Sequence, residues 1–402
     1  MKEGWDYKTI GEVIDHLRTG LNPRTHFKLN TPDAEGYYIT VRELKGFAIE
    51  PDEKTDKVNR AAIKRINERS NLKIGDVLFS GTGTIGKTAL VSELPVNWNI
   101  KEGVYAMTPK HSELNSKYFI YYIGSDLFLR LVNDKAAGTG VRSIPMKELV
   151  KLPIYIPSLS EQQSIVDYLD SAFAKVDAMK ANAEKQLSEA RALFQKALTK
   201  AMEPKEGWEE KKLEDLCTDI VDCPHSTPRK VDHPTKYPCI RTSELKGGKI
   251  EWESMQYLDE DEYIVRTARI KPQPNDIVYG REGTYGDAVL LPEGYYFSLG
   301  QRTMLFRPDV RCVEPKYLHY NVISSHVYEQ AKAKNSGCGV GHVNVKDIKV
   351  FKIGVPPLSE QQRIVSRLDS LSAHVRELEE VLQKTIAECD ALKQALLRQV
   401  FE

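Results

Sequence analysis

The chain has 402 residues, with 57 basic and 57 acidic side chains and therefore no formal net charge. This length is typical of two to three domains, and the charge balance confines any polyanion site to local clusters of Arg and Lys. No apolar run approaches the roughly 20 residues that span a bilayer, and the start, MetLysGluGlyTrp, lacks a secretory signal, so we expect a cytoplasmic protein without membrane contact.

The segment 1–156 combines turn residues with short β-branched runs, which predicts an α+β globular domain. We expect a strand at 76–80 and a helix near 117–132. After that strand, residues 81–88 are GlyThrGlyThrIleGlyLysThr, which fits the phosphate-loop pattern and, over its first six residues, the dinucleotide-binding pattern. Taken alone, this segment would predict a nucleotide-binding enzyme.

A long helix is predicted over 157–203. Ser160 stands three residues before Gln163, which is the spacing of a capping box. No Gly or Pro follows until Pro204, and apolar or small residues recur in steps of three and four along one narrow stripe. Such a stripe is typical of a helix that pairs with another helix.

The chain then repeats itself. LysGluGlyTrp at 2–5 returns at 205–208, and SerLeuSerGluGlnGlnSerIleVal at 158–166 returns as ProLeuSerGluGlnGlnArgIleVal at 357–365. The near-constant offset indicates a tandem duplication of a whole unit, so we expect a second domain at 204–356 and a second long helix at 357–402. Such a duplication suits a protein that touches two places at a fixed separation.

The second copy tests the nucleotide-binding pattern. Its aligned residues 281–288 are ArgGluGlyThrTyrGlyAspAla, which keep Gly283, Thr284 and Gly286 but lack the Lys and the hydroxyl that follows it. Short apolar runs come next in both copies, where a phosphate site would need the N-terminus of a helix. A Gly-rich hairpin explains both copies, and nucleotide binding remains the weaker alternative.

All six cysteines lie in the second copy. A disulfide or structural zinc required by the shared fold would recur in the first copy, so reduced thiols are expected. His225, His233 and Cys239 have irregular spacing and no counterpart, so we interpret them as loop residues and expect no metal site. The sequence also lacks the HExxH and GxSxG motifs, and we expect no catalytic residues.

The two long helices most simply bury their stripes on each other. The predicted fold class is therefore α+β, with two similar α/β globular domains separated by two long helices that form an intramolecular antiparallel coiled coil with pseudo-two-fold symmetry. At 1.5 Å per residue, each helix would be on the order of 60 Å long. The two chain termini should then lie close together.

The two copies differ most at their turns. IleThrValArgGluLeuLysGly at 39–46 aligns with IleArgThrSerGluLeuLysGly at 240–247, which puts Arg42 and Arg241 at neighbouring positions. Donors and acceptors on Gly-rich loops suit base edges and phosphates, although for any single residue a solvated loop is an equal alternative. A common frame with differing tips predicts recognition of two unlike half-sites.

With these residues in view, the chain resembles the specificity subunit of type I restriction-modification systems. The resemblance rests on GlyTrpAspTyrLysThrIleGlyGluVal and GlyTrpGluGluLysLysLeuGluAspLeu at the start of each copy, on GlyAsp-type hairpins, on Pro-x-LeuSerGluGlnGln-x-IleVal before each long helix, and on the repeat. It implies that the domains are target-recognition domains, that the helices are spacers and that the subunit is not itself catalytic.

The resemblance also implies partners. These are double-stranded DNA read as a bipartite sequence, two methyltransferase subunits that modify adenine, and restriction subunits in the full complex. No cofactor is expected on this chain, because S-adenosylmethionine, ATP and Mg would belong to the partner subunits.

Site residues follow by analogy on the variable loops. DNA contact is predicted for Arg24, Arg42, Lys45, Thr82, Lys87, Arg142, Arg229, Arg241, Lys246, Arg281, Glu282, Tyr285, Arg302 and His342. Glu282 would accept a hydrogen bond from a cytosine amine or brace Arg281. Partner binding is predicted for Ser160, Gln162, Gln163, Ser359, Gln361 and Gln362.

Two other classes of function remain open. A coiled-coil scaffold for proteins only would not bind duplex DNA, even with its partners present. A nucleotide-hydrolysing enzyme acting through Gly81 to Thr88 would lose an activity on Lys87→Ala, whereas a DNA-reading subunit has no such activity to lose.

Overall fold

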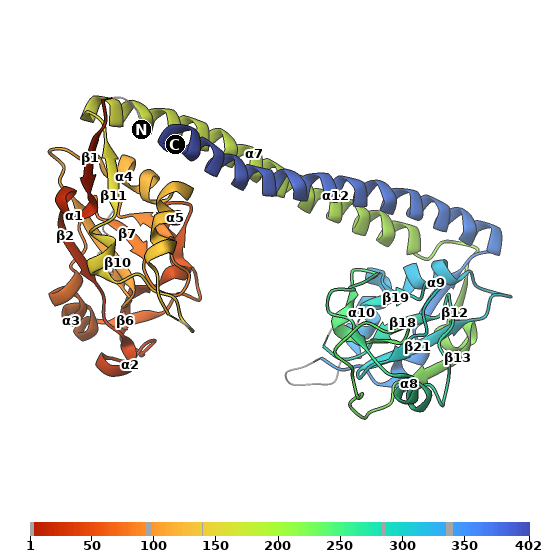
Figure 1. Cartoon of the computed structure of the whole chain (residues 1–402). Helices are drawn as coiled ribbons and strands as arrows, with labels where there is room; N and C mark the ends of the chain where they lie inside the picture. The colour runs from red at the N-terminus through yellow and green to blue at the C-terminus, as the bar shows by residue number, and fades with distance from the viewer. Residues whose placement is uncertain (1–3, 93–97, 139, 284–285, 335–340) are drawn as a thin grey trace. The chain divides into compact units, whose positions relative to one another are not determined.

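The computed structural model describes residues 4–92, 98–138, 140–283, 286–334 and 341–402 (Figure 1). The chain divides into two compact units, the first comprising Met1–Ala183 with Lys384–Glu402 and the second Glu184–Gln383. Each unit contains one α+β domain together with parts of both long helices. Among the described residues, none of the helices is both long and apolar enough to cross a membrane.

A four-stranded antiparallel sheet forms the centre of the first domain. Its strands lie in the order β2 (Ile14–Thr19), β10 (Val104–Pro109), β7 (Val77–Ser80) and β8 (Thr88–Leu90). Helices α4 (Ser116–Ile123) and α5 (Asp126–Lys135) pack against this sheet with fully buried aromatic side chains. The single helix predicted near 117–132 is therefore two helices, because Gly124 ends α4 and Ser125 caps α5.

A second, three-stranded sheet of the first domain supports helix α3 (Arg60–Ser70). Its order is β6 (Lys57–Asn59), β3 (Ala34–Ile39) and β9 (Trp98–Ile100). The remaining elements are two strand pairs and short helices: β1 (Asp6–Thr9) with β11 (Pro153–Ile156), β4 (Leu44–Lys45) with β5 (Ala48–Ile49), α1 (Ile10–Val13), α2 (Pro23–His26), η1 (Val41–Glu43) and α6 (Met146–Leu149).

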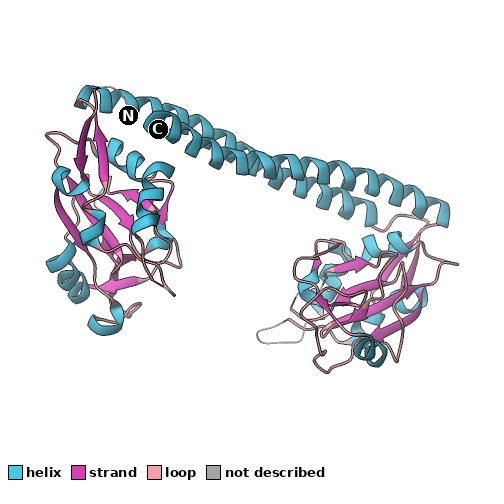
Figure 2. Ribbon diagram, viewed as in Figure 1, coloured by secondary structure: helices cyan, strands magenta, loops and turns pink. Residues whose placement is uncertain are grey.

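The second domain repeats this topology (Figure 2). Its four-stranded sheet has the order β13 (Cys217–Asp222), β21 (Thr303–Pro308), β18 (Ile277–Gly280) and β19 (Ala288–Leu290), and its three-stranded sheet has β17 (Gln256–Tyr257), β14 (Pro238–Ile240) and β20 (Ser298–Leu299). The other elements are β12 (Glu209–Lys212) with β22 (Lys352–Val355), β15 (Leu245–Lys246) with β16 (Lys249–Ile250), η2 (Leu213–Leu216), η3 (Thr242–Glu244), α8 (Glu260–Arg266), α9 (Pro315–Val322), α10 (Ser325–Ala333) and α11 (Val345–Lys349). The duplication seen in the sequence therefore extends to strand order.

Each domain is followed by a helix of 44 residues, α7 (Leu159–Met202) and α12 (Leu358–Phe401). The predicted capping box at Ser160 is wrong, because α7 already begins at Leu159. The cap is Ser158, whose hydroxyl accepts a hydrogen bond from the backbone N–H of Glu161 at 3.3 Å. The sequence Ser-x-x-Glu therefore starts this helix two residues earlier than expected.

The two long helices run antiparallel. In the first unit, the beginning of α7 lies beside the end of α12, where Lys180 pairs with Asp390 at 2.8 Å and Lys393 with Asp177 at 2.5 Å. In the second unit, the end of α7 lies beside the beginning of α12, where Arg191 pairs with Glu379 at 2.8 Å (Figure 1). The predicted intramolecular antiparallel helix pair is confirmed.

The last turn of each long helix enters a domain core. Leu397, Val400 and Phe401 belong to the main core of the first unit, and Leu198 and Met202 belong to that of the second. Burial of such side chains contributes about 1.5–3 kcal/mol each. Each domain core is therefore completed by residues from the C-terminal end of a long helix.

The two chain ends meet in the first unit. The rings of Trp5 and Phe401 lie 6.3 Å and 5.5 Å from the ring of Tyr118, both in edge-on geometry. One buried tyrosine thus contacts both terminal segments, which confirms the expected closeness of the termini.

Candidate nucleic-acid interface

The Gly-rich segment is the turn of a β-hairpin in both domains. Strands β7 and β8 pair antiparallel, as do β18 and β19, so Thr88 begins a strand where a phosphate loop would begin a helix. Gly83 and Gly86 have φ values of 76° and 94°, and Gly283 and Gly286 have 74° and 98°. Because residues with a Cβ rarely adopt these angles, the shared glycines serve the turn, and the hairpin prediction is confirmed.

A second loop joins each hairpin turn and brings predicted residues together. Thr82 forms a β-bridge with Ser143, and the N–H of Gly83 donates to the carbonyl of Arg142 at 2.9 Å. At the matching place in the second domain, Glu282 forms a β-bridge with His342. We call these two places the hairpin sites; the predicted Tyr285 lies outside the described residues.

The hairpin site of the second domain is a network of charged groups. Arg281 is 7% exposed, and its Nε lies 3.0 Å from Oδ1 of Asp222. The guanidinium of Arg281 also lies 3.5 Å from the carboxylate of Glu282. The Glu282 carboxylate contacts His342 and Arg302 at 3.1 Å each. Arg281 is thus fully engaged inside the protein, while the side chain of Arg302 is 57% exposed and can reach a ligand.

The hairpin site of the first domain carries different chemistry. Gly81 stands where the second domain has Arg281, and a Cβ there would lie 2.1 Å from the ring of Tyr105. The hydroxyl of Tyr105 donates to the carbonyl of Ile144 at 2.8 Å. The first site therefore presents the exposed Thr82 above a buried tyrosine ring, where the second presents ionic groups.

Asp222 belongs to this network but was not predicted from the sequence. The first domain has Thr19 at the matching register position, because Tyr105 pairs with Thr19 and Met304 with Asp222. The available signal was an acidic residue at the end of β13 in the sheet that also contains β18, which Arg281 follows directly; an arginine needs a counter-charge when buried.

Arg42 and Arg241 each bind a buried glutamate. Arg42 contacts Glu43 at 2.8 Å and Arg241 contacts Glu244 at 2.6 Å, and the two carboxylates are 1% and 0% exposed. Burial alone would raise the pKa of Glu43, but hydrogen bonds from Thr40 and Arg42 outweigh it and hold that pKa below its ordinary value. Both arginines therefore form ion pairs within their own domain, and their contact with DNA stays a prediction.

Lys45 and Lys246 lie on equivalent small hairpins beside the long helices. In the first hairpin Phe47 stacks on Phe173 of α7 with ring centroids 6.0 Å apart. In the second, Lys249 lies 3.9 Å from Glu379 of α12. DNA contact by these two lysines stays a prediction as well.

The other predicted DNA contacts lie apart from these networks. Arg24 on α2 and Lys87 on the first hairpin are exposed, and Arg229 lies 3.8 Å and 3.9 Å from Asp259 and Glu262. In the part of the chain that the structure describes, no three His, Cys, Asp or Glu side chains gather as a metal site.

Two of the predicted partner-binding residues are buried. The side-chain amide of Gln162 donates to the carbonyls of Glu113 and Pro157, and its oxygen accepts from the N–H of Asn115 at 2.8 Å. Gln361 makes the same three kinds of bond in the second domain. Both are 0% exposed and so fasten a long helix to its own domain rather than face a partner.

The other four predicted partner-binding residues, Ser160, Gln163, Ser359 and Gln362, are exposed. Two large apolar side chains stand among them at equivalent positions, Leu159 at 43% and Leu358 at 39% exposure. These surfaces at the start of each helix remain candidates for partner contact.

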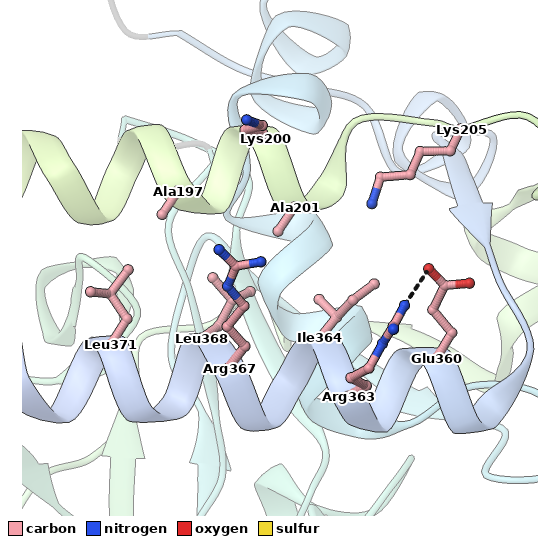
Figure 3. Close-up of a pocket in the computed structure, with 10 residues that line it drawn as sticks. All are labelled: Ala197, Lys200, Ala201, Lys205, Glu360, Arg363, Ile364, Arg367, Leu368 and Leu371. Atoms are coloured by element: carbon pink, nitrogen blue, oxygen red, sulfur yellow. Dashed lines mark hydrogen bonds and ion pairs between the residues drawn. The ribbon is translucent and has the colours of Figure 1, made fainter.

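A groove between the end of α7 and the start of α12 lies in the second unit (Figure 3). Its volume is about 590 Å³, and Ala197 and Ala201 face Ile364, Leu368 and Leu371 across it. Basic side chains line it too, namely Lys200, Lys205, Arg363 and Arg367. The positions that align with the two alanines hold Leu396 and Val400 in the other helix, so the groove exists because its α7 residues are small.

Comparison with known proteins adds a family. A model described as the type I restriction modification DNA specificity domain matches residues 2–189 and again 205–388. The chain is 20% identical over 350 residues to the type I restriction enzyme EcoBI specificity subunit of Escherichia coli, covering 81% of this chain and 73% of that protein. It is 22% identical over 432 residues to the StySPI specificity subunit of Salmonella potsdam, covering 100% and 89%.

Solved structures share the fold. A chain from a type I R-M system, studied for its complex assembly and conformational transition, aligns with a TM-score of 0.73 at 18% identity over 100% of this chain and 98% of that one. The HsdS subunit from Thermoanaerobacter tengcongensis aligns with a TM-score of 0.51 at 18% identity, covering 100% and 97%.

Proposed function

Because this chain belongs to the type I restriction modification DNA specificity family, we propose that its two domains each recognise one half of an asymmetric, bipartite DNA sequence. The paired helices α7 and α12 set the gap between the two halves. Methyltransferase subunits dock on the chain, restriction subunits join the full complex, and S-adenosylmethionine, ATP and Mg are held by those partners.

The observation that supports this proposal most strongly is the contrast between the two hairpin sites. Both domains build the same turn with glycines at the same positions, yet one site presents the exposed Thr82 above the buried Tyr105 and the other presents Glu282, Arg302 and His342. Carboxylates, guanidinium groups and hydroxyls favour different base edges in the major groove. A shared frame with unlike tips is what recognition of two different half-sites requires.

Selection of bound DNA tests the proposal. The chain, assembled with its methyltransferase subunits, is mixed with random duplexes, and the retained fragments are sequenced. We expect two short unlike motifs at a constant spacing. A single motif, or fragments with no shared sequence, would contradict the bipartite proposal, and a complete lack of DNA retention would favour a scaffold for proteins only.

The assignment of half-sites to domains is tested by a variant. Arg302 has a positive φ of 68°, which asparagine tolerates. Arg302→Asn therefore removes the exposed guanidinium without straining the backbone. We expect relaxed sequence preference in one motif and an unchanged second motif. As a matched control, Thr82→Ala in the first domain should relax the other motif; relaxation of both motifs by either variant would contradict separate recognition.

For partner docking, we propose that a methyltransferase subunit contacts the groove of Figure 3. Small residues on its α7 side leave room for an apolar side chain, and its four basic side chains favour acidic neighbours on the partner. Ala197→Glu should weaken co-elution of the methyltransferase subunit, whereas Arg376→Glu, an exposed site on the same helix pair outside the groove, should not. Equal co-elution of both variants would place the docking surface elsewhere.

A further inference from the structure

Helix α3 of the first domain has a basic exposed side. Ala62, Ile63 and Ile66 are buried in a small core with Tyr38 and Val58. The exposed side carries four basic residues and one acidic residue: Arg60, Lys64, Arg65, Arg69 and Glu68. Arg60 and Lys64, like Arg65 and Arg69, are like charges four residues apart, whereas Glu68 stands four residues after Lys64 and Arg69 lies in the last turn, where a cation is favourable. The exposed side of this helix is therefore net basic.

The basic side chains continue onto the neighbouring segment. A guanidinium nitrogen of Arg65 donates to the carbonyl of His26 at 3.3 Å, which ties α3 to α2. Arg24 and Lys28 on that segment are exposed. We call the six residues Arg24, Lys28, Arg60, Lys64, Arg65 and Arg69 the α2–α3 basic face.

The cations of this face outnumber the carboxylates beside them, and Glu68 is the acidic residue on the exposed side of α3. Among the described residues, none of its six side chains forms an ion pair within 4 Å. The nearby Asp33 accepts a hydrogen bond from Asn59 at 3.0 Å and so is engaged at the helix start. Within the first unit, α2 and α3 lie on the side away from the long helices (Figure 1). A cluster of cations held open at this position is suited to an external polyanion.

The equivalent helix of the second domain has the opposite charge. Helix α8 also follows a strand of the three-stranded sheet, and an acidic N-cap, Asp259, takes the place of Asn59. Its first turn holds Glu260, Asp261 and Glu262. Its exposed side also includes Ile264 at 57% and Val265 at 70% exposure. An acidic and apolar surface repels phosphate, so the two domains cannot grip a DNA backbone in the same way.

From this reversal we infer that the α2–α3 basic face of the first domain binds the phosphate backbone of DNA, and that the second domain has no corresponding backbone contact at α8. The inference rests on the proposed function and deepens it. Sequence-independent affinity is then concentrated on the first half-site, while the second half-site depends on its hairpin site.

The salt dependence of binding tests the inference. Each neutralised phosphate contact makes the slope of log K against log salt more negative by about 0.9. The full chain with its methyltransferase subunits is titrated onto a fluorescent random duplex and onto the selected bipartite duplex. We expect Arg60→Gln with Lys64→Gln to make this negative slope shallower by roughly 2 on both duplexes, because two contacts are lost, with unchanged base preference. The matched control, Lys135→Gln with Lys147→Gln, should leave the slope unchanged.

The second domain supplies the converse experiment. Asp261 is exposed and forms no ion pair among the described residues, so Asp261→Lys removes repulsion without breaking a contact. We expect this variant to bind the random duplex several-fold more tightly than the parent chain.

Two results would overturn the inference. One is an unchanged salt slope in the Arg60 and Lys64 double variant, and the other is loss of the methyltransferase subunits from that variant in size-exclusion chromatography, which would make the face a protein contact. Either result leaves the proposed function intact if the parent complex still selects a bipartite sequence. Failure of the parent complex to select DNA would instead contradict the proposed function.

Discussion

At the scale of single residues, arginines reach equivalent buried carboxylates from different positions in the two domains. Arg42 and Arg241 differ by two places in the alignment, yet each binds the glutamate of its 3₁₀ turn. Asp76 is paired by Arg18 on strand β2, and its counterpart Asp276 by Arg307 on strand β21, at 2.8 Å and 2.7 Å. A buried carboxylate must be paired, but the partner can come from any strand within reach.

Arg281 and Arg302 should separate stability from recognition. Arg281→Met leaves Asp222 and Glu282 without their shared cation, so we expect a loss of about 3 kcal/mol in the free energy of unfolding. Arg302→Asn removes only an exposed ion pair, which costs less than about 1 kcal/mol. Denaturant unfolding of both variants checks this; equal losses would mean that Arg302 is as structural as Arg281.

His319 should make the second domain sensitive to acid. It lies buried against the carbonyl of Ala288 at 3.1 Å, and burial lowers its pKa to about 4. An unfolded histidine binds its proton near pH 6.5. The free energy of unfolding therefore keeps its full value, as far as His319 is concerned, above about pH 6.5. It falls by up to roughly 3 kcal/mol as the pH drops to 4, because His319 is protonated in the unfolded chain before it is protonated in the folded one.

The first domain provides the control for His319. Ile120 occupies the matching place on α4 and is 1% exposed. His319→Ile should therefore flatten the dependence of the melting temperature on pH between 7.5 and 4.5. Parallel profiles for the parent chain and this variant would show that other groups cause the acid sensitivity.

At the scale of elements, the buried glutamines Gln162 and Gln361 attach the start of each long helix to its own domain through hydrogen bonds. Each buried amide makes three hydrogen bonds to the backbone of its own domain. Gln162→Ala or Gln361→Ala leaves a buried N–H without an acceptor, so we expect a loss of about 2–4 kcal/mol in urea unfolding. The neighbour Gln362→Ala should cost no more than about 0.5 kcal/mol, and a similar loss there would refute a special role for Gln361.

Elements were predictable wherever a local pattern determines them. The apolar stripe predicted both long helices within two residues, and comparison of the copies identified the Gly-rich hairpin, because these depend on periodicity and turn chemistry. The cap of α7 was placed two residues late because Ser158 and Ser160 both fit a capping pattern. Burial of Gln162, the role of Asp222 and the charge of α3 depend on contacts between distant segments, which no local pattern reveals.

At the scale of the whole molecule, family membership was predictable from the duplicated motifs and is confirmed. The Gly-rich hairpins, the hydrogen bonds of Gln162 and Gln361, and the contacts between α7 and α12 repeat in both units. Side chains that carry charge outside the shared frame do not repeat, as α3 and α8 demonstrate. Duplication has therefore preserved the frame, while the exposed charges of the two copies have diverged.

Closeness of the two termini predicts that the chain can be circularly permuted. Because Trp5 and Phe401 both contact Tyr118, a short link from Glu402 to Gly4 should cost little strain, and a new start at Lys205 follows the end of α7. We expect this permutant to melt within a few degrees of the parent chain and to select the same two motifs at the same spacing. A permutant opened between Gln383 and Lys384, inside α12, should be much less stable; equal stability of both would contradict the continuity of that helix.

The insertion of Leu397, Val400 and Phe401 into the first domain imposes an order on biosynthesis. A nascent polypeptide emerges amino end first, so part of the first domain's core stays uncovered until residues 397–401 have been translated. A chain truncated before these residues would therefore have an incomplete core in its first domain, and its exposed apolar surface would be open to chaperones and proteases.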